Sequence, residues 1–204
     1  DQILRTKREW VDFGSHVIPQ SLARRKVYAH PFVGFWEDIG TVRSYYEVSI
    51  SLTSPNPPFE FYDTRHLIFT NVRYLPGARI QGAVIKDSIV CEGSRLVGAT
   101  VSESIIGIRT NISRGATVER SIIMGADYYE EDEKPDGIPM GIGPGSRISG
   151  AIIDKNARIG KNVTIRGSRR LRDKTGKGWA VRDGIVIVMK NAEIPDGTVI
   201  GLFV

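Results

Sequence analysis

Aliphatic residues recur every six positions through the C-terminal half of the chain. Segments 153–165 and 188–200 both carry an aliphatic residue at their first, seventh and thirteenth positions, and both contain Lys-Asn-Ala at the same offset, beginning at Lys155 and Lys190. A period of six fits neither an α-helix nor a plain β-strand. It is typical of a β-solenoid, in which each straight side of a coil contributes one inward aliphatic side chain.

A second marker gives the length of a coil. Ser-Ile-Val or Ser-Ile-Ile begins at Ser88, Ser104 and Ser121, and Ala-Ile-Ile begins at Ala151. The first three are 16 and 17 residues apart, which matches coils with three sides of about six residues. The longer intervals further along predict two insertions that protrude as loops, at 125–137 and 166–183, with Trp179 holding down the end of the second.

The first 79 residues follow a different pattern. Residues 26–36 alternate between apolar and polar and predict two short strands, while residues 42–52 have helical spacing, with Thr41 as the N-cap. Proline-rich residues 53–58 mark a boundary. We therefore predict the C-terminal tail of an α/β domain over 1–52, a linker over 53–79 and a mainly β solenoid over 80–204.

Charge and composition narrow the partners. The net charge is +5, but the positive charge gathers in residues 166–177 and acidic residues at 127–136 partly offset it. Local basic loops of this kind usually meet small phosphates, a partner subunit or solvent, so we expect no nucleic-acid binding. No window approaches the roughly 20 apolar residues of a membrane span, so we expect no membrane partner. The single cysteine, Cys91, excludes an internal disulfide framework.

Asp38 is the first candidate for chemistry. It ends a predicted strand and is followed by a glycine turn and the predicted helix, in Trp36-Glu-Asp-Ile-Gly-Thr41. A carboxylate placed in this way suits a hard cation held against phosphate oxygens. The alternative is that Asp38 only caps the turn, because one carboxylate is not a metal site.

Lys155 and Lys190 are the second candidate. Their equal phase predicts that they lie on one face of neighbouring coils, about 4.8 Å apart. Two ammonium groups at that distance repel by about 1 kcal/mol in water and about 3–4 kcal/mol at an effective dielectric constant of 20. An unrelieved repulsion of that size favours binding of an anion. The alternative is that both side chains splay into solvent.

Several motifs together resemble the C-terminal half of ADP-glucose pyrophosphorylase, also called glucose-1-phosphate adenylyltransferase, especially its plant and cyanobacterial-like form. The motifs run in the family's order over nearly the whole chain: Asp12-Phe-Gly14 and Ile18-Pro19, Trp36–Thr41, Tyr62-Asp63, Arg73-Tyr-Leu-Pro76, Met124-Gly-Ala-Asp-Tyr-Tyr129, Ile142-Gly143 and Ile152–Gly160.

The resemblance implies a fold and a reaction. It implies a left-handed parallel β-helix, a hexapeptide-repeat solenoid, preceded by the tail of an α/β nucleotidyltransferase domain and assembled as a homo- or hetero-tetramer. The reaction would be ATP plus glucose 1-phosphate giving ADP-glucose and pyrophosphate for glycogen or starch synthesis. The location would be cytoplasmic in a bacterium and plastidial in a plant.

The resemblance also implies roles for individual residues. Asp38 matches the second of two aspartates that hold the catalytic Mg²⁺, and Arg73, Lys155 and Lys190 match residues that bind phosphorylated effectors and phosphate. The family's glycine-rich nucleotide loop, first metal aspartate and sugar-phosphate lysine have no counterpart here. We expect them upstream of Asp1, and therefore expect this segment to be inactive alone.

Three other functions fit parts of the pattern. Another sugar-phosphate nucleotidyltransferase with a β-helix tail would differ in residues upstream. A hexapeptide-repeat acyltransferase usually places a histidine base between coils, but no histidine follows His66. A structural solenoid that only mediates oligomerisation would bind no phosphate.

Overall fold

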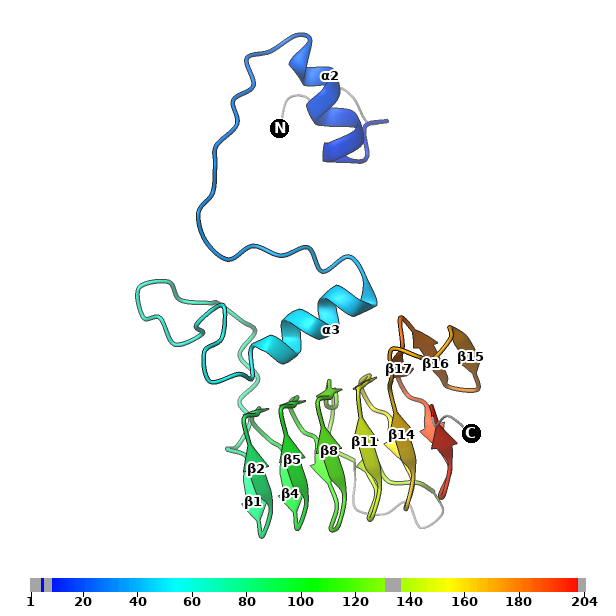
Figure 1. The fold of residues 1–204 in the computed structure, drawn as a ribbon. Coiled ribbons are helices and arrows are strands. Elements are labelled where there is room, and N and C mark those ends of the chain that lie inside the picture. Colours follow the sequence, from blue (N-terminus) through cyan, green and yellow to red (C-terminus); the bar gives the residue numbers. More distant parts are fainter. Residues whose placement is uncertain (1–4, 6–8, 131–136, 202–204) are drawn as a thin grey trace. The chain divides into compact units, whose positions relative to one another are not determined.

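The computed structural model describes residues 5, 9–130 and 137–201 (Figure 1). The chain divides into two compact units, one ending at Phe35 and the other beginning at Trp36. The second unit contains the solenoid and the helix that packs on it. The domain boundaries that were predicted after residues 52 and 79 stay predictions.

The first unit is helical. The π-helix η1 (Phe13–Val17) leads directly into α2 (Ile18–Leu22), and the carboxylate of Asp12 accepts the backbone N–H of Ser15 at 2.6 Å. The prediction of two strands over residues 26–36 is wrong, because these residues form no strand in the structure. A strand needs a partner for its backbone hydrogen bonds, and no described segment pairs with this one.

Three sheets form the sides of the solenoid in the second unit. The first contains, in spatial order, β1 (Arg79–Gln81), β4 (Arg95–Val97), β7 (Asn111–Ile112), β10 (Gly141–Ile142), β13 (Arg158–Ile159) and β18 (Glu193–Ile194). The second contains β2 (Val84–Lys86), β5 (Thr100–Ser102), β8 (Thr117–Glu119), β11 (Arg147–Ser149), β14 (Thr164–Arg166) and β19 (Val199–Ile200). The third contains β3 (Ile89–Val90), β6 (Ile105–Ile106), β9 (Ile122–Ile123), β12 (Ala151–Ile153), β17 (Ile185–Val188), β16 (Trp179–Arg182) and β15 (Lys174–Gly176).

The six-residue ladder forms the core, as predicted. In the first sheet, parallel pairing places aliphatic side chains of successive coils in register, and all are at most 2 % exposed. They are Leu96, Ile112, Ile142, Ile159 and Ile194. Each such burial contributes about 1.5–3 kcal/mol. No coil can exclude water from these side chains alone, so stacking stabilises them.

The serine marker has a structural cause. The Ser88 hydroxyl accepts the Ser104 N–H at 3.2 Å, and the Ser104 hydroxyl accepts the Ser121 N–H at 3.1 Å. The Ser121 hydroxyl accepts the Ala151 N–H at 3.2 Å. The serines therefore continue the hydrogen-bond ladder through a corner where strand pairing is interrupted.

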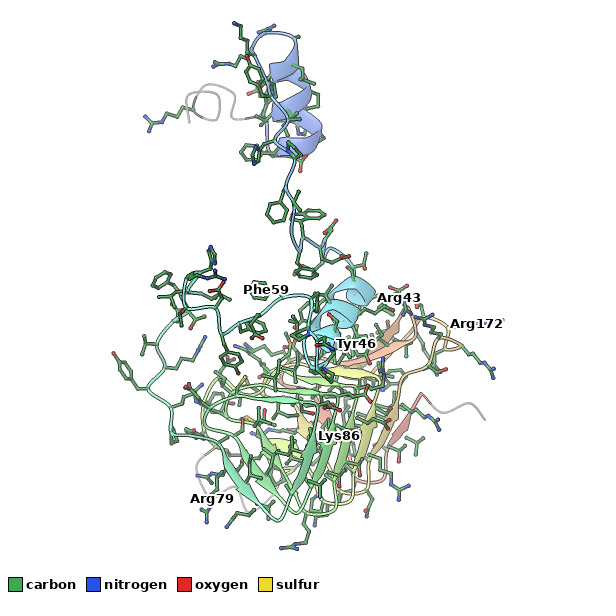
Figure 2. The ribbon with its side chains drawn as sticks, turned by 60° about the vertical axis from the view of Figure 1, so that its left-hand side comes forward. Arg43, Tyr46, Phe59, Arg79, Lys86 and Arg172 are labelled. Atoms are coloured by element: carbon green, nitrogen blue, oxygen red, sulfur yellow. The ribbon has the colours of Figure 1, made fainter. Side chains whose placement is uncertain are left out.

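The predicted helix 42–52 is confirmed as α3 (Val42–Ser51), and the Thr41 side chain caps it by accepting the Ser44 N–H at 3.0 Å. Figure 1 shows α3 lying along the row of coils. Tyr46 and Ile50 bury against outward isoleucines of the third sheet, Ile122 and Ile152 among them. Tyr46 projects from α3 toward the coils (Figure 2) and donates to the Arg120 carbonyl at 2.5 Å. The helix is thus part of the solenoid unit.

The second insertion is not the protruding loop that its composition predicted. Residues 174–182 form β15 and β16, which extend the third sheet in antiparallel fashion from β17. Ala180 and Val181 are buried in this extension, and Val181 belongs to the hydrophobic core of the solenoid. Trp179 packs against the core, as expected, with the Lys174 ammonium 5.8 Å from its ring centroid.

Within the described residues, no helix is long and apolar enough to cross a membrane.

Candidate functional site

The candidate site lies at the corner that follows the third sheet in each coil, here called the lysine corner. Its backbone forms a ladder between coils: the Asn156 N–H donates to the Gly125 carbonyl and the Asn191 N–H donates to the Lys155 carbonyl, both at 3.0 Å. Lys155 and Lys190 are therefore adjacent rungs on one face, as their phase predicted.

The repeated Lys-Asn-Ala follows from the shape of this corner. Asn156 and Asn191 have φ values of 61° and 59°. Among residues with side chains, asparagine tolerates this left-handed conformation best. The asparagine turns the chain, the following Ala157 is buried beneath the corner, and the preceding lysine is left pointing outward.

Asp127 lies between the two lysines. Its two carboxylate oxygens are 2.8 Å from Lys155 Nζ and 2.7 Å from Lys190 Nζ. Neither alternative drawn from the sequence describes this arrangement: the lysines do not splay apart, and their repulsion is relieved by the protein's own carboxylate. Sequence analysis missed Asp127 because it is 28 residues from Lys155, at the start of an insertion.

The Asn156 side chain fixes the position of Asp127. The Asp127 N–H donates to Asn156 Oδ1 at 2.8 Å, and Asn156 Nδ2 donates to Asp127 Oδ2 at 3.2 Å. The same Nδ2 donates to Asn191 Oδ1 at 3.0 Å. Asn156 is only 5 % exposed, so this hydrogen-bonded amide forms a rigid base for the site. The repeated Lys-Asn-Ala was the sequence feature from which the role of Asn156 could have been predicted.

Residues 125–130, here called the insertion stem, lie across the corner. Gly125 begins the stem with φ 88°, and a Cβ there would lie 2.1 Å from the Ile108 carbonyl oxygen. Further along, the Tyr129 hydroxyl donates to the Gly93 carbonyl at 3.3 Å. The Arg109 guanidinium lies 5.6 Å from the Tyr129 ring centroid. These contacts place Asp127 over the lysines; the rest of the predicted insertion, residues 131–136, lies outside the described residues.

The two lysine charges of the corner are offset by nearby carboxylates. Hydrogen bonds from Lys155 and then from Lys190 hold the pKa of the Asp127 carboxyl well below its usual range. The hydrogen bond between Lys190 and Asp127 also raises the pKa of the Lys190 ammonium group. Both lysine side chains and Asp127 remain about one third to one half exposed. The Asp154 carboxylate also acts electrostatically on Lys190, so two cations face two anions, and the partly exposed ammonium groups remain reachable by a small oxyanion.

We expect the stabilising effect of Asp127 to depend on pH. A carboxyl with a lowered folded pKa stabilises the fold above its unfolded pKa of about 3.9 and loses that effect as the pH falls. Lys190, with a raised pKa, stabilises the fold below its unfolded value of about 10.4. The melting-temperature difference between the wild-type chain and Asp127→Asn should therefore be constant from about pH 5 to pH 9 and shrink outside this range. A difference that does not change between pH 7 and pH 3 would contradict the ion-pair geometry.

Arg73 lies in the extended connector before β1, and the structure does not bring it to the lysines. It makes no hydrogen bond or ion pair with another described residue. Pro76, shortly after it, accepts the Gly93 N–H at 2.7 Å on the same corner. That rung is four coil steps from Lys155, which is about 19 Å at 4.8 Å per step. The effector role of Arg73 stays a prediction.

Asp38 caps the turn before α3. Its Oδ1 accepts the Gly40 N–H at 2.9 Å, and the side chain is exposed. Among residues 5, 9–130 and 137–201, no three His, Cys, Asp or Glu side chains lie together as a metal site would require. Asp38 Oδ2 makes no hydrogen bond to a described residue, so the residue fits one oxygen ligand of a hard cation but not a complete site. The magnesium role also stays a prediction.

Comparison with known protein families agrees with this architecture. The model of the GLGC left-handed parallel beta-helix domain matches residues 73–199, more than half of the chain. The match confirms the predicted fold class, including its left-handed coiling, and spans Lys155, Lys190 and the insertion stem. We conclude that the chain belongs to the GLGC family and contains the left-handed β-helix domain of glucose-1-phosphate adenylyltransferase.

Proposed function

We propose that this β-helix domain is the regulatory and assembly part of a tetrameric enzyme that makes ADP-glucose and pyrophosphate from ATP and glucose 1-phosphate. We further propose that the lysine corner binds phosphorylated effectors and phosphate. One observation carries the second proposal: two ammonium groups of adjacent coils converge on the two oxygens of a single carboxylate, at 2.8 and 2.7 Å.

A phosphate can use the same geometry. It offers several oxygens on one centre, and lysine binds phosphate as a point charge that does not require a fixed approach angle. The side chains are held on one rigid face by the coil ladder, so little ordering is needed when the anion arrives. Partial exposure gives the anion access from solvent.

The catalytic contribution of this chain would come from Asp38. Its free carboxylate oxygen would supply one ligand to Mg²⁺, and the metal would polarise phosphate oxygens during the transfer. Asp38 is held in orientation by the Gly40 N–H at the N-terminal side of α3. Groups outside this chain would complete the metal site and bind the substrates. Arg73 would supply a guanidinium fork for effector phosphate outside the lysine corner.

The lysine proposal is tested by calorimetric titration of inorganic phosphate into the chain at constant ionic strength. We expect wild-type binding and at least about tenfold weaker binding by Lys155→Ala/Lys190→Ala, equivalent to 1.4 kcal/mol. In the complete enzyme the same pair of substitutions should flatten the response to phosphate and activator.

The matched control is Lys86→Ala/Lys161→Ala, which removes two positive charges from exposed positions away from the corner. An equal loss of phosphate affinity in both double variants would show that the effect comes from the net charge of the protein and not from the lysine corner. Absence of phosphate binding by both the wild-type chain and Asp127→Asn would instead favour the purely structural solenoid.

A further inference from the structure

Asp127 occupies the position that an oxyanion would take between Lys155 and Lys190. Each of its carboxylate oxygens contacts one ammonium group, so both inward-facing contacts of the pair are already used. The Asp127 carboxylate and a phosphate cannot occupy this space at the same time if the phosphate contacts both lysines in the same way. Two anions at that distance would also repel.

We propose that Asp127 is a built-in competitor of the anion site: its carboxylate closes the lysine pair in the anion-free protein and is displaced when an anionic effector binds. This inference rests on the proposed anion-binding function of the same lysines and adds how that site is regulated.

Displacement requires little structural change. Asp127 belongs to the insertion stem and to none of the strands, so no aliphatic core contact depends on its side chain. The carboxylate is held by the two lysines and by Asn156 Nδ2, while its backbone N–H has a separate bond to Asn156 Oδ1. Rotation of the side chain alone would release the lysines and leave the stem anchored.

Competition by a tethered group sets the affinity of the site. A carboxylate fixed beside the lysines acts at a high effective concentration, so an incoming anion binds with a lower apparent affinity than the lysine pair would give by itself. A higher concentration of the anion is then needed to occupy the site than would be needed without the tethered carboxylate. Removing the carboxylate charge should remove this competition.

The test compares phosphate affinity in Asp127→Asn and wild-type chains by calorimetric titration at constant ionic strength and pH 7.5. We expect the Kd for inorganic phosphate to fall about tenfold in Asp127→Asn, equivalent to 1.4 kcal/mol. Asp127→Ala should give the same direction, and thermal melting establishes that each variant is folded. The matched control is Glu103→Gln, which removes a carboxylate that also forms one ion pair, with Arg120 at 2.8 Å, on a different corner.

A second measurement reports displacement directly. The Asn156 side-chain amide donates to Asp127 and to Asn191, so saturating phosphate should shift its NMR resonances in the wild-type chain and shift them much less in Asp127→Asn. Unchanged or weaker phosphate binding in Asp127→Asn would overturn the competitor role, as would an equal gain in Glu103→Gln. Wild-type binding that depends on Lys155 and Lys190 would still support the anion site in that case, whereas no binding by any variant would overturn both proposals.

Discussion

Ile159→Asp is expected to unfold the C-terminal coils of the β-helix. Ile159 is fully buried and lies in register between Ile142 and Ile194. The substitution removes an aliphatic contact with both neighbouring coils and places a carboxylate where no polar partner exists. Its cost should be about 4–5 kcal/mol or more, which is a large part of the stability of an ordinary domain.

Thermal melting by circular dichroism and amide hydrogen exchange would measure this effect. Because each coil contacts only its neighbours, amides of β13 and β18 should lose protection more than those of β1 and β4. The control is Val199→Asp, the same change at an outward position that is 56 % exposed. A melting curve of Ile159→Asp that matches the wild type would contradict the ladder as the source of stability.

Gly125→Ala is expected to have the second largest effect. Gly125 has φ 88°, and its added Cβ would lie 2.1 Å from the Ile108 carbonyl oxygen and 2.9 Å from Ile108 N. The positive φ alone costs about 1–2 kcal/mol for a residue with a side chain, and the backbone clash adds to it. Relief of the clash must move the stem, so both stability and the position of Asp127 should change.

Two controls separate these causes. Gly197→Ala adds a Cβ at φ 68° with no atom within 4 Å, so it measures the conformational cost alone. Gly77→Ala also has open space and lies in the extended connector without a positive φ, so it measures the loss of a glycine at an unstrained position. Gly125→Ala should lower the melting temperature most and alter phosphate affinity, whereas the controls should leave phosphate affinity unchanged. Equal melting temperatures for Gly125→Ala and Gly197→Ala would show that the close approach to Ile108 is not maintained in solution.

Much of the solenoid could be predicted because its information is local and repeated. A coil repeats every 16 or 17 residues, so an aliphatic residue at one phase predicts its partners in the next coil. The helix at 42–51 was equally local, since Thr41 caps it and its apolar spacing follows one face. The strands expected at 26–36 failed for the complementary reason: strand formation depends on a partner, which alternation within one segment does not reveal.

The lysine corner, too, was predicted from the sequence only in part. Its two lysines were found from their equal phase, but Asp127 and the Asn156 amide that holds it were not. Both depend on how the insertion stem leaves the coil at Gly125 and passes over the next two rungs. The antiparallel strands β15 and β16 were also missed, because a short basic segment with three apolar residues becomes a strand only beside the open edge of β17.

The sequence by itself therefore determined the coil period, the identity of the core residues, the capped helix and the common face of Lys155 and Lys190. Only the tertiary structure decided what lies between those lysines. Periodicity specifies contacts between equivalent positions of neighbouring coils, whereas an insertion has no equivalent position. Where its side chains come to rest is decided by backbone geometry and by the charges that they meet, and for Asp127 these are the two lysines of the corner.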